Sequence, residues 1–206
     1  MQSLIQIEAG DRRLLAGIAE AVAEVSRRSG DWLVCRPGCI ECCKAPFAIT
    51  QLDALRLREG LRTLSVADPA RAERVRRRAA EYVAAIAPDY PGDPATGMLR
   101  EQDAFSEAMD DVPCPALDTE TGCCELYAAR PITCRTFGPV MWTREGSLGA
   151  CELCYGGATD EEKIQCAVDI DPEGLETELL AGLDALGLRG MTIVAFALAA
   201  AITHPA

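Results

Sequence analysis

The stretch WLVCRPGCIECCKAPF, residues 32–47, holds four of the chain's 11 cysteines. Pro37 and Gly38 stand inside it, and because this pair is typical of a turn, we expect the cysteines to lie on a loop. A gap of two residues, as between Cys39 and Cys42, lets a turn aim two thiolates at one metal ion or cluster. The stretch therefore predicts a metal-binding loop.

A second cysteine-rich zone spans residues 112–157 and has the same loop character. Its cysteines fall in four groups: Cys114-Pro115, Cys123-Cys124, Cys134, and Cys151-x2-Cys154. We expect one small β-hairpin here, with its turn at residues 118–122. Cys166 lies outside both zones, among apolar residues, and is expected to be a small buried side chain.

Nine cysteines are expected to ligate metal: Cys35, Cys39, Cys42, Cys43, Cys114, Cys124, Cys134, Cys151 and Cys154. Four thiolates saturate one zinc ion or one cubane cluster, so this set suffices for one centre with spares or for two centres. The single histidine, His204, is close to the C-terminal end, so ligation is expected to be by thiolates throughout. This favours an iron–sulfur cluster of the 4Fe-4S type, and zinc stays open as the alternative.

Helical periodicity surrounds the two zones. Helices are expected over six stretches: residues 11–29, from Thr50 to about 59, residues 69–86, a short one through Phe105 and Met109, one capped by Asp171 with Pro172 first, and residues 191–202. Strands do not alternate with helices, so we predict a mainly α fold, an irregular helical domain with two cysteine-rich loop zones. The whole chain, residues 1–206, is expected to be one domain with a helical insertion at about 50–110.

Composition and charge limit the classes of partner that we expect for this chain. The net charge is −12, which disfavours nucleic acid as a partner. No apolar run is long enough to cross a bilayer, and no signal peptide is recognisable, so we expect a cytoplasmic protein without a membrane partner. In that compartment disulfides are rare, and the cysteines are expected to be reduced. The partner is expected to be an unidentified protein or small molecule.

Five arginines, Arg71, Arg74, Arg76, Arg77 and Arg78, lie close together in the expected helix 69–86. Arg71, Arg74 and Arg78 share one face. A patch for nucleic acid or an acidic partner is one interpretation. Because the chain as a whole is acidic, a solvated helix face is favoured.

The cysteine spacing carries a resemblance. Cys35-x3-Cys39-x2-Cys42-Cys43, followed by the segment CELYAARPITCR at residues 124–135, resembles the CxxCxxCC family of zinc- or iron-chelating proteins, the YkgJ-like cysteine-cluster proteins. The matching positions of the second half are Cys124, Tyr127, Arg130, Pro131, Cys134 and Arg135. The first gap has three residues where the family has two, and the spacing to Tyr127 favours Cys124 over Cys123. The resemblance implies a bound metal or cluster.

Side chains beside the expected ligands have supporting roles in this interpretation. Arg36, Lys44 and Arg135 flank the ligands and can offset the negative charge of an all-thiolate centre. Arg130 and Arg135 are expected either to donate hydrogen bonds to ligand sulfurs, which is favoured, or to close the preceding turn, and Tyr127 is expected to pack beside the centre.

The sequence favours a cluster-binding protein with a structural or redox role over two enzymatic alternatives. Radical S-adenosylmethionine enzymes share the first spacing, but Glu41 stands where they usually carry an aromatic residue, and no βα barrel follows. A protein N-methyltransferase-like enzyme, with the cluster as scaffold, is the other. It is suggested by flagellin lysine-N-methylase, a family member that resembles this chain only in the cysteine zones. No G-x-G-x-x-G follows a strand, so the sequence shows no S-adenosylmethionine site.

Overall fold

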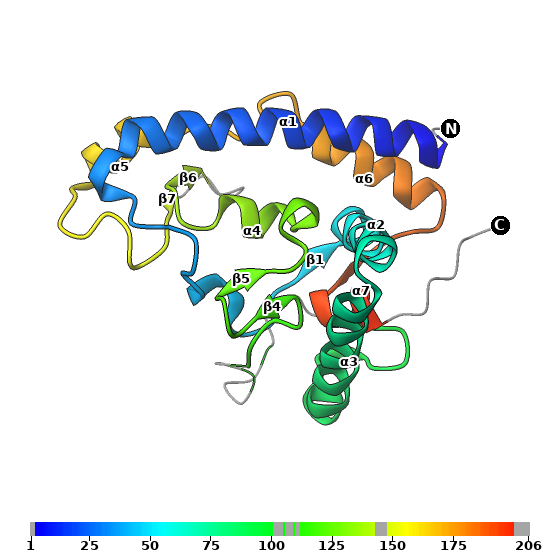
Figure 1. The fold of residues 1–206 in the computed structure, drawn as a ribbon. Helices are drawn as coiled ribbons and strands as arrows, with labels where there is room; N and C mark the ends of the chain where they lie inside the picture. Colours follow the sequence, from blue (N-terminus) through cyan, green and yellow to red (C-terminus); the bar gives the residue numbers. More distant parts are fainter. Residues whose placement is uncertain (1–2, 101–104, 106–108, 110–111, 143–147, 200–206) are drawn as a thin grey trace. The chain divides into compact units, whose positions relative to one another are not determined.

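The computed structural model describes residues 3–100, 105, 109, 112–142 and 148–199 (Figure 1). The chain divides into two compact units: unit 1 is Met1–Pro37 with Ile132–Leu186, and unit 2 is Gly38–Pro131 with Gly187–Ala206. Both boundaries within the cysteine-rich segments follow a proline, and each cysteine zone contributes residues to both units. That the whole chain forms one domain stays a prediction.

Unit 1 is organised along one long helix, α1 (Leu4–Ser29). A capping box at Ser3 and Gln6 starts it: the Ser3 hydroxyl accepts from the Gln6 amide at 3.3 Å, and the Ser3 amide donates to Gln6 Oε1 at 2.8 Å. The helix therefore begins earlier than the apolar periodicity from residue 11 indicated. It ends at Gly30, as predicted, where φ is 49°.

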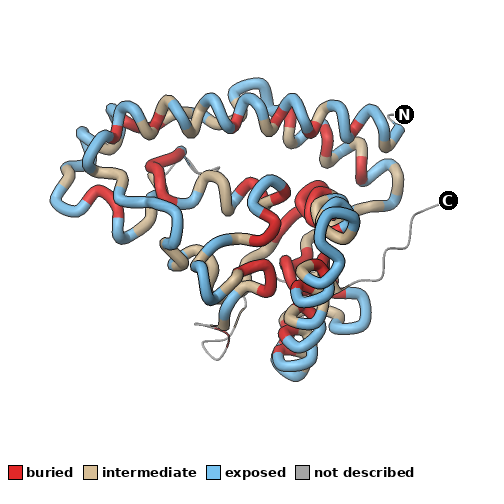
Figure 2. Tube along the Cα trace, in the orientation of Figure 1, coloured by how far each residue is buried: buried red, intermediate tan, exposed pale blue. Residues whose placement is uncertain are grey.

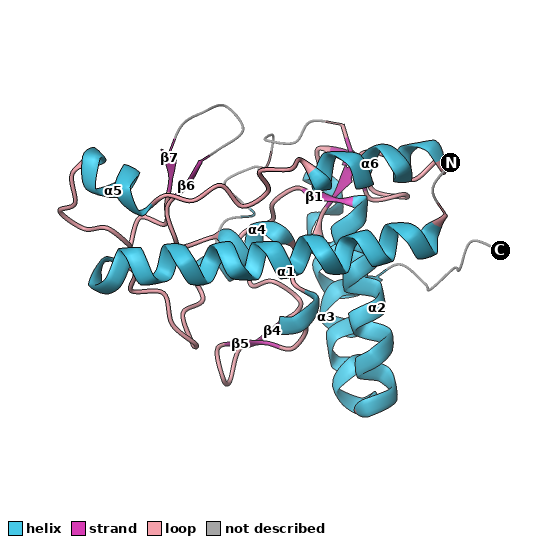
Figure 3. Ribbon diagram, turned by 90° about the horizontal axis from the view of Figure 1, so that it is seen from above, coloured by secondary structure: helices cyan, strands magenta, loops and turns pink. Residues whose placement is uncertain are grey.

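Helix α6 (Leu175–Ala185) lies beside α1 (Figures 1 and 3). Gly10 permits the close approach, because an added Cβ there would lie 2.5 Å from Leu179 Cδ2. Asp171 caps α6 by accepting from the Leu175 amide at 2.9 Å. Pro172 stands before the helix, so the prediction that it is the first helical residue is wrong.

Shorter elements complete unit 1. They are η1 (Gly30–Trp32), α4 (Ile132–Thr136), α5 (Asp160–Cys166), and the strands β6 (Met141–Trp142) and β7 (Leu148–Gly149), which pair antiparallel. Helix α5 was not predicted, although its capping box at Thr159 and Glu162 is readable in the sequence.

Unit 2 is built on three helices, α2 (Gln51–Ala67), α3 (Pro69–Ile86) and α7 (Val194–Ala199), which pack on one another. The predicted caps at Thr50 and Asp68 are both present, while α2 runs eight residues beyond the expected end. Figure 2 shows that buried positions follow one side of α3 and that its other side is exposed. Their shared core is apolar and fully buried at Ala54, Leu57, Ala72, Val75, Ala79 and Leu198.

Short strand pairs and 3-10 turns connect these helices (Figure 3). They are β1 (Ile49–Thr50) with β8 (Met191–Thr192), β2 (Gly92–Asp93) with β3 (Met98–Leu99), β4 (Leu117–Asp118) with β5 (Cys123–Cys124), and the turns η2 (Glu41–Cys43), η3 (Ala87–Asp89) and η5 (Tyr127–Ala129). The β4–β5 pair is the predicted hairpin. Residues 191–192 form a strand, so the expected final helix begins only at Val194.

The mainly α prediction is confirmed. Seven α-helices and only two-stranded sheets make up the described residues. Most of the expected short helix through Phe105 and Met109, namely residues 101–104, 106–108 and 110–111, and the end of the last helix beyond residue 199 lie outside the described residues. No helix of the described chain is long and apolar enough to cross a membrane.

Candidate metal centre

The two cysteine-rich zones meet within unit 2. The Cys114 amide donates to the Cys43 carbonyl at 2.7 Å, which joins segments about 70 residues apart in the sequence. At the tip of the β4–β5 hairpin, Gly122 has a φ of 68°, and an added Cβ there would lie 3.2 Å from the Cα of Gly38. Only a glycine fits this combination of left-handed backbone and close approach. The hairpin is therefore held against the first cysteine loop at two places.

Four thiols interact at this junction: those of Cys42, Cys43, Cys114 and Cys124. The Cys42 and Cys43 side chains share a hydrogen bond, which together with burial raises the pKa of Cys42 far above its ordinary range. Burial raises the pKa of Cys114 to about 12, and the nearby thiols of Cys124 and Cys42 add to the effect. At neutral pH the thiols of Cys42 and Cys114 are therefore protonated in the metal-free chain.

Apolar packing explains the burial. Cys114 and Cys124 pack against the core shared by α2, α3 and α7. Cys114 also lines a small apolar pocket together with Phe47 and Tyr82. A thiolate in such surroundings is poorly solvated, so it requires a positive partner.

Arg130 supplies positive charge to this group of thiols. Burial is the main influence on the pKa of Cys124 and raises it, while the charge of Arg130 acts in the opposite direction on both Cys124 and Cys42. The guanidinium lies 3.7 Å from the ring centroid of Tyr127, a cation–π contact. Arg56 donates to the Arg130 carbonyl at 3.4 Å. Tyr127 thus contacts Arg130, which is a more specific role than the packing beside the centre that the sequence predicts.

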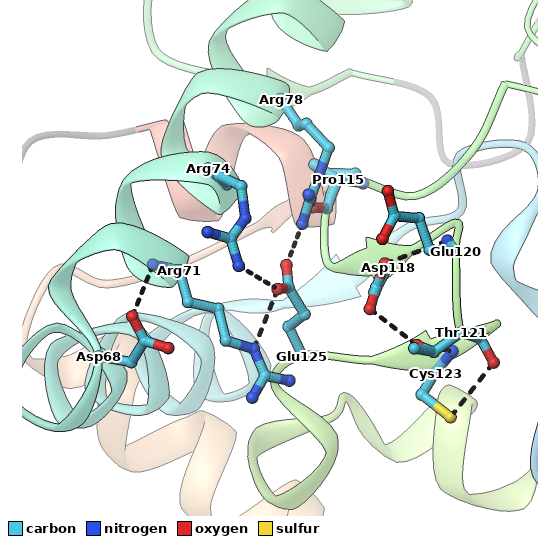
Figure 4. A network of polar contacts seen from close by, with 10 residues as sticks. All are labelled: Asp68, Arg71, Arg74, Arg78, Pro115, Asp118, Glu120, Thr121, Cys123 and Glu125. Carbon is cyan, nitrogen blue, oxygen red and sulfur yellow. Dashed lines mark hydrogen bonds and ion pairs between the residues drawn. The ribbon is translucent and has the colours of Figure 1, made fainter.

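The side chains of the adjacent Cys123 and Cys124 point in different directions, because they alternate along a strand. Successive side chains of β5 point to opposite faces, and Cys124 is the one turned toward the other thiols. Cys123 is exposed, and its Sγ lies 3.7 Å from the Thr121 carbonyl (Figure 4). Cys39, two residues before η2, is half-buried and takes no part in the interactions that join the four thiols.

Unit 1 gathers three further candidates, Cys35, Cys151 and Cys154. The Cys154 amide donates to the Cys151 carbonyl at 2.9 Å, which closes a tight turn, and the two side chains share a hydrogen bond. Burial raises the pKa of Cys154, while backbone amides of Val34 and Cys35 that donate to its sulfur oppose the rise. Gly138, with a φ of 122°, makes room for Cys35, because an added Cβ would lie 3.3 Å from the Cβ of that residue.

The last two cysteines also belong to unit 1. Cys134 is half-buried in α4. Cys166 is only 6% exposed, and its thiol lies 3.5 Å from the Arg28 carbonyl, so the expectation of a buried side chain is confirmed. Cys39 and Cys134 lie in different units, and their meeting at one centre stays a prediction.

The arginine face of α3 is partly exposed, as expected of a solvated face, but it also forms ion pairs that the sequence did not predict. Arg71, Arg74 and Arg78 all point at one carboxylate, that of Glu125, whose side chain is only 2% exposed (Figure 4). The Nε of Arg71 lies 3.0 Å from Glu125 Oε1, Arg74 is at 3.9 Å, and Arg78 forms a close ion pair and donates its Nε to the Pro115 carbonyl at 2.9 Å. Sequence reasoning missed Glu125, since nothing in its local pattern marks it as buried.

A model of one protein family matches residues 34–155, more than half of the chain, and is described as a "putative zinc- or iron-chelating domain". The chain belongs to the CxxCxxCC family. The match begins before the first cysteine loop and ends just after Cys154, so α2 and α3 lie inside the CxxCxxCC region. No curated protein and no solved structure matches the chain.

Membership of the CxxCxxCC family supports metal binding, and the donor set in unit 2 suits it. Four sulfurs from two chain segments are the ligands that zinc and iron–sulfur clusters prefer. Among the described residues, no group of three Cys, His, Asp or Glu side chains is already arranged to hold an ion. Metal ligation requires thiols to lose their protons.

Proposed function

We propose that this chain is a metal-binding protein whose centre in unit 2 is ligated by Cys42, Cys43, Cys114 and Cys124. The observation that supports this most strongly is that pairwise interactions connect the four thiols, which come from η2, from the stretch before β4 and from β5, while the charge of Arg130 acts on Cys42 and Cys124. In an ordinary apolar core, larger apolar side chains at these positions would stabilise the fold more, because a thiol packs as a small hydrophobe with little volume.

An iron–sulfur cluster is the form of metal that we favour. Such clusters take thiolates throughout, whereas zinc sites often include histidine, and the four proposed ligands are all cysteines. When bound, a cluster would supply either a structural crosslink or a one-electron redox couple. A zinc ion would supply only the crosslink, since zinc has no redox chemistry.

The residues of unit 2 have distinct parts in binding. The four thiols must release protons before they ligate, and the raised pKa values of Cys42, Cys114 and Cys124 make metal affinity increase with pH. Arg130, braced by Tyr127, offsets the negative charge that the thiolates acquire. The apolar core behind Cys114 and Cys124 limits the access of water to their sulfurs.

The other expected ligands, Cys35, Cys39, Cys134, Cys151 and Cys154, remain proposed ligands, either of the same centre or of a second one. A role as a protein N-methyltransferase-like enzyme gains no support from the described residues. A cytoplasmic location and an unidentified protein or small-molecule partner remain part of the proposal.

The test is purification of the full chain without oxygen, followed by assay of iron, zinc and acid-labile sulfide on the same sample. Iron and sulfide in equal amounts are expected. Zinc alone would replace the cluster by a structural zinc site and would overturn the redox role. A metal-free chain with 11 free thiols would overturn metal binding itself.

A further inference from the structure

Arg78 contacts both of the short segments that carry Cys114 and Cys124. Its Nε donates to the carbonyl of Pro115, the residue after Cys114, and its Nη2 pairs with Glu125, the residue after Cys124 (Figure 4). One guanidinium on α3 therefore holds the immediate neighbours of two proposed ligands.

The remaining contacts of Glu125 strengthen this link. Its amide donates to the Ala116 carbonyl at 2.8 Å, and its carboxylate also pairs with Arg71. A carboxylate that is 2% exposed is costly to bury unless it is paired, so the ion pairs must form when the hairpin docks on α3. A planar guanidinium with fixed donor directions suits this double contact better than a lysine would.

We infer that Arg78 and Glu125 are positioning residues of the metal centre, which fix the separation of Cys114 from Cys124. This inference rests on the proposed function. Both side chains would act indirectly, because Arg78 contacts the Pro115 carbonyl and the Glu125 carboxylate, and these residues directly follow Cys114 and Cys124. In the sequence, α3 lies between the two halves of the cysteine motif. The contacts of Arg78 give this intervening helix a part in metal binding.

The experiment titrates the reduced, full-length chain with Co²⁺ in the absence of oxygen and follows the sulfur-to-cobalt charge-transfer absorption. Three variants are compared with the wild type: Arg78→Met, Arg78→Lys and Glu125→Gln. Arg77→Met is the matched control, because Arg77 lies on the same helix with a 64% exposed side chain and pairs with the exposed Glu81 at 3.8 Å. Circular dichroism checks that each variant keeps its helices.

Loss of a group that orients ligands commonly lowers metal affinity by about 10–100-fold. We expect a loss in this range for Arg78→Met, a smaller loss for Arg78→Lys, which keeps the charge but not both donors, and wild-type affinity for Arg77→Met. If Arg78→Met does not fold, Glu125→Gln decides, because it keeps the size of the side chain and is expected to weaken binding by about tenfold.

Wild-type affinity and an unchanged spectrum in a folded Arg78→Met or Glu125→Gln variant would overturn the positioning role and leave the proposed function intact. A wild-type chain without charge-transfer absorption, indistinguishable from Cys114→Ser, would overturn the proposed function and the positioning role with it.

Discussion

The two units gather their cysteines in different ways. In unit 1, Cys151 and Cys154 share one turn, and the backbone at Gly138 makes room for Cys35. In unit 2, Cys42 and Cys114 come from segments about 70 residues apart, and side-chain ion pairs from α3 hold the second segment in place.

This difference separates local from long-range assembly. A turn closed by one backbone hydrogen bond needs little beyond its own residues, whereas a cluster drawn from distant segments must offset the loop-closure entropy with tertiary contacts. The unit 2 thiols should therefore be sensitive to charge changes on α3, and the unit 1 thiols to backbone changes near Gly138.

Replacing a half-buried unit 2 thiol that packs against the apolar core should have the largest effect. In Cys114→Ser we expect bound metal to fall at least tenfold, because serine does not supply a thiolate to a thiophilic metal. Metal content per chain after purification without oxygen is the measurement. Cys123→Ser is the control, since Cys123 is exposed and turned away. Equal metal loss in both variants would contradict the assignment of the four thiols.

The second-largest effect is expected from removing the carboxylate of Glu125, which Arg71 and Arg78 share. Glu125→Ala leaves Arg71 and Arg78 without their shared counter-charge, and because these arginines are partly exposed and can be solvated, we expect a cost of about 2 kcal/mol from the lost charge-assisted hydrogen bonds. The free energy of unfolding of the metal-free chain, from urea titration, measures it. In Glu81→Ala the lost pair with Arg77 is exposed, so a change of about 0.5 kcal/mol or less is expected. Equal losses would show that the α3 ion pairs do not hold the hairpin.

Alkaline pH should weaken the metal-free chain through the buried thiols of unit 2. The pKa of Cys114 is about 12 when folded and near 9 when unfolded, so its stabilising contribution is complete below about pH 9. Between these values the folded chain keeps a proton that the unfolded chain has lost, and the free energy of unfolding falls by about 1.4 kcal/mol per pH unit for such a thiol. Cys114→Ser should show a shallower fall from pH 9 to 11. Parallel curves would mean that Cys114 is not buried.

A backbone change in unit 1 should have the smallest effect. Gly138→Ala forces a residue with a side chain into a φ of 122° and crowds Cys35, at a cost of about 1–2 kcal/mol. Thermal or urea unfolding measures the change. Gly156→Ala, where an added Cβ meets no atom within 4 Å, is the control and should stay close to the wild type. A stable Gly138→Ala variant would show that this approach does not organise the unit 1 thiols.

Local signals in the sequence predicted much of the fold. The caps at Thr50 and Asp68, the stop at Gly30 and the hairpin after residue 116 are encoded within a few residues, and the structure has all of them. The spacing of the cysteines likewise pointed to the family that the comparison shows.

What sequence reasoning missed depends on contacts between distant residues. Pairing of Thr50 with Met191 turns the start of an apparent helix into a strand. The burial of Glu125 follows from packing against α3, and only that packing gives Arg78 a role other than exposure to solvent. Arginines recur at the same helical spacing whether their face is solvated or pairs with a buried carboxylate, so the sequence pattern does not distinguish the two cases.

X-ray absorption at the metal edge of the purified full chain tests the central claim most directly. The account predicts a first shell of about four sulfur atoms at about 2.3 Å, with no nitrogen or oxygen ligand. In Cys42→Ser and Cys114→Ser this shell should be lost or reduced, while in Cys123→Ser it should be unchanged. A first shell of nitrogen or oxygen, or a sulfur shell unaltered in both Cys42→Ser and Cys114→Ser, would contradict it.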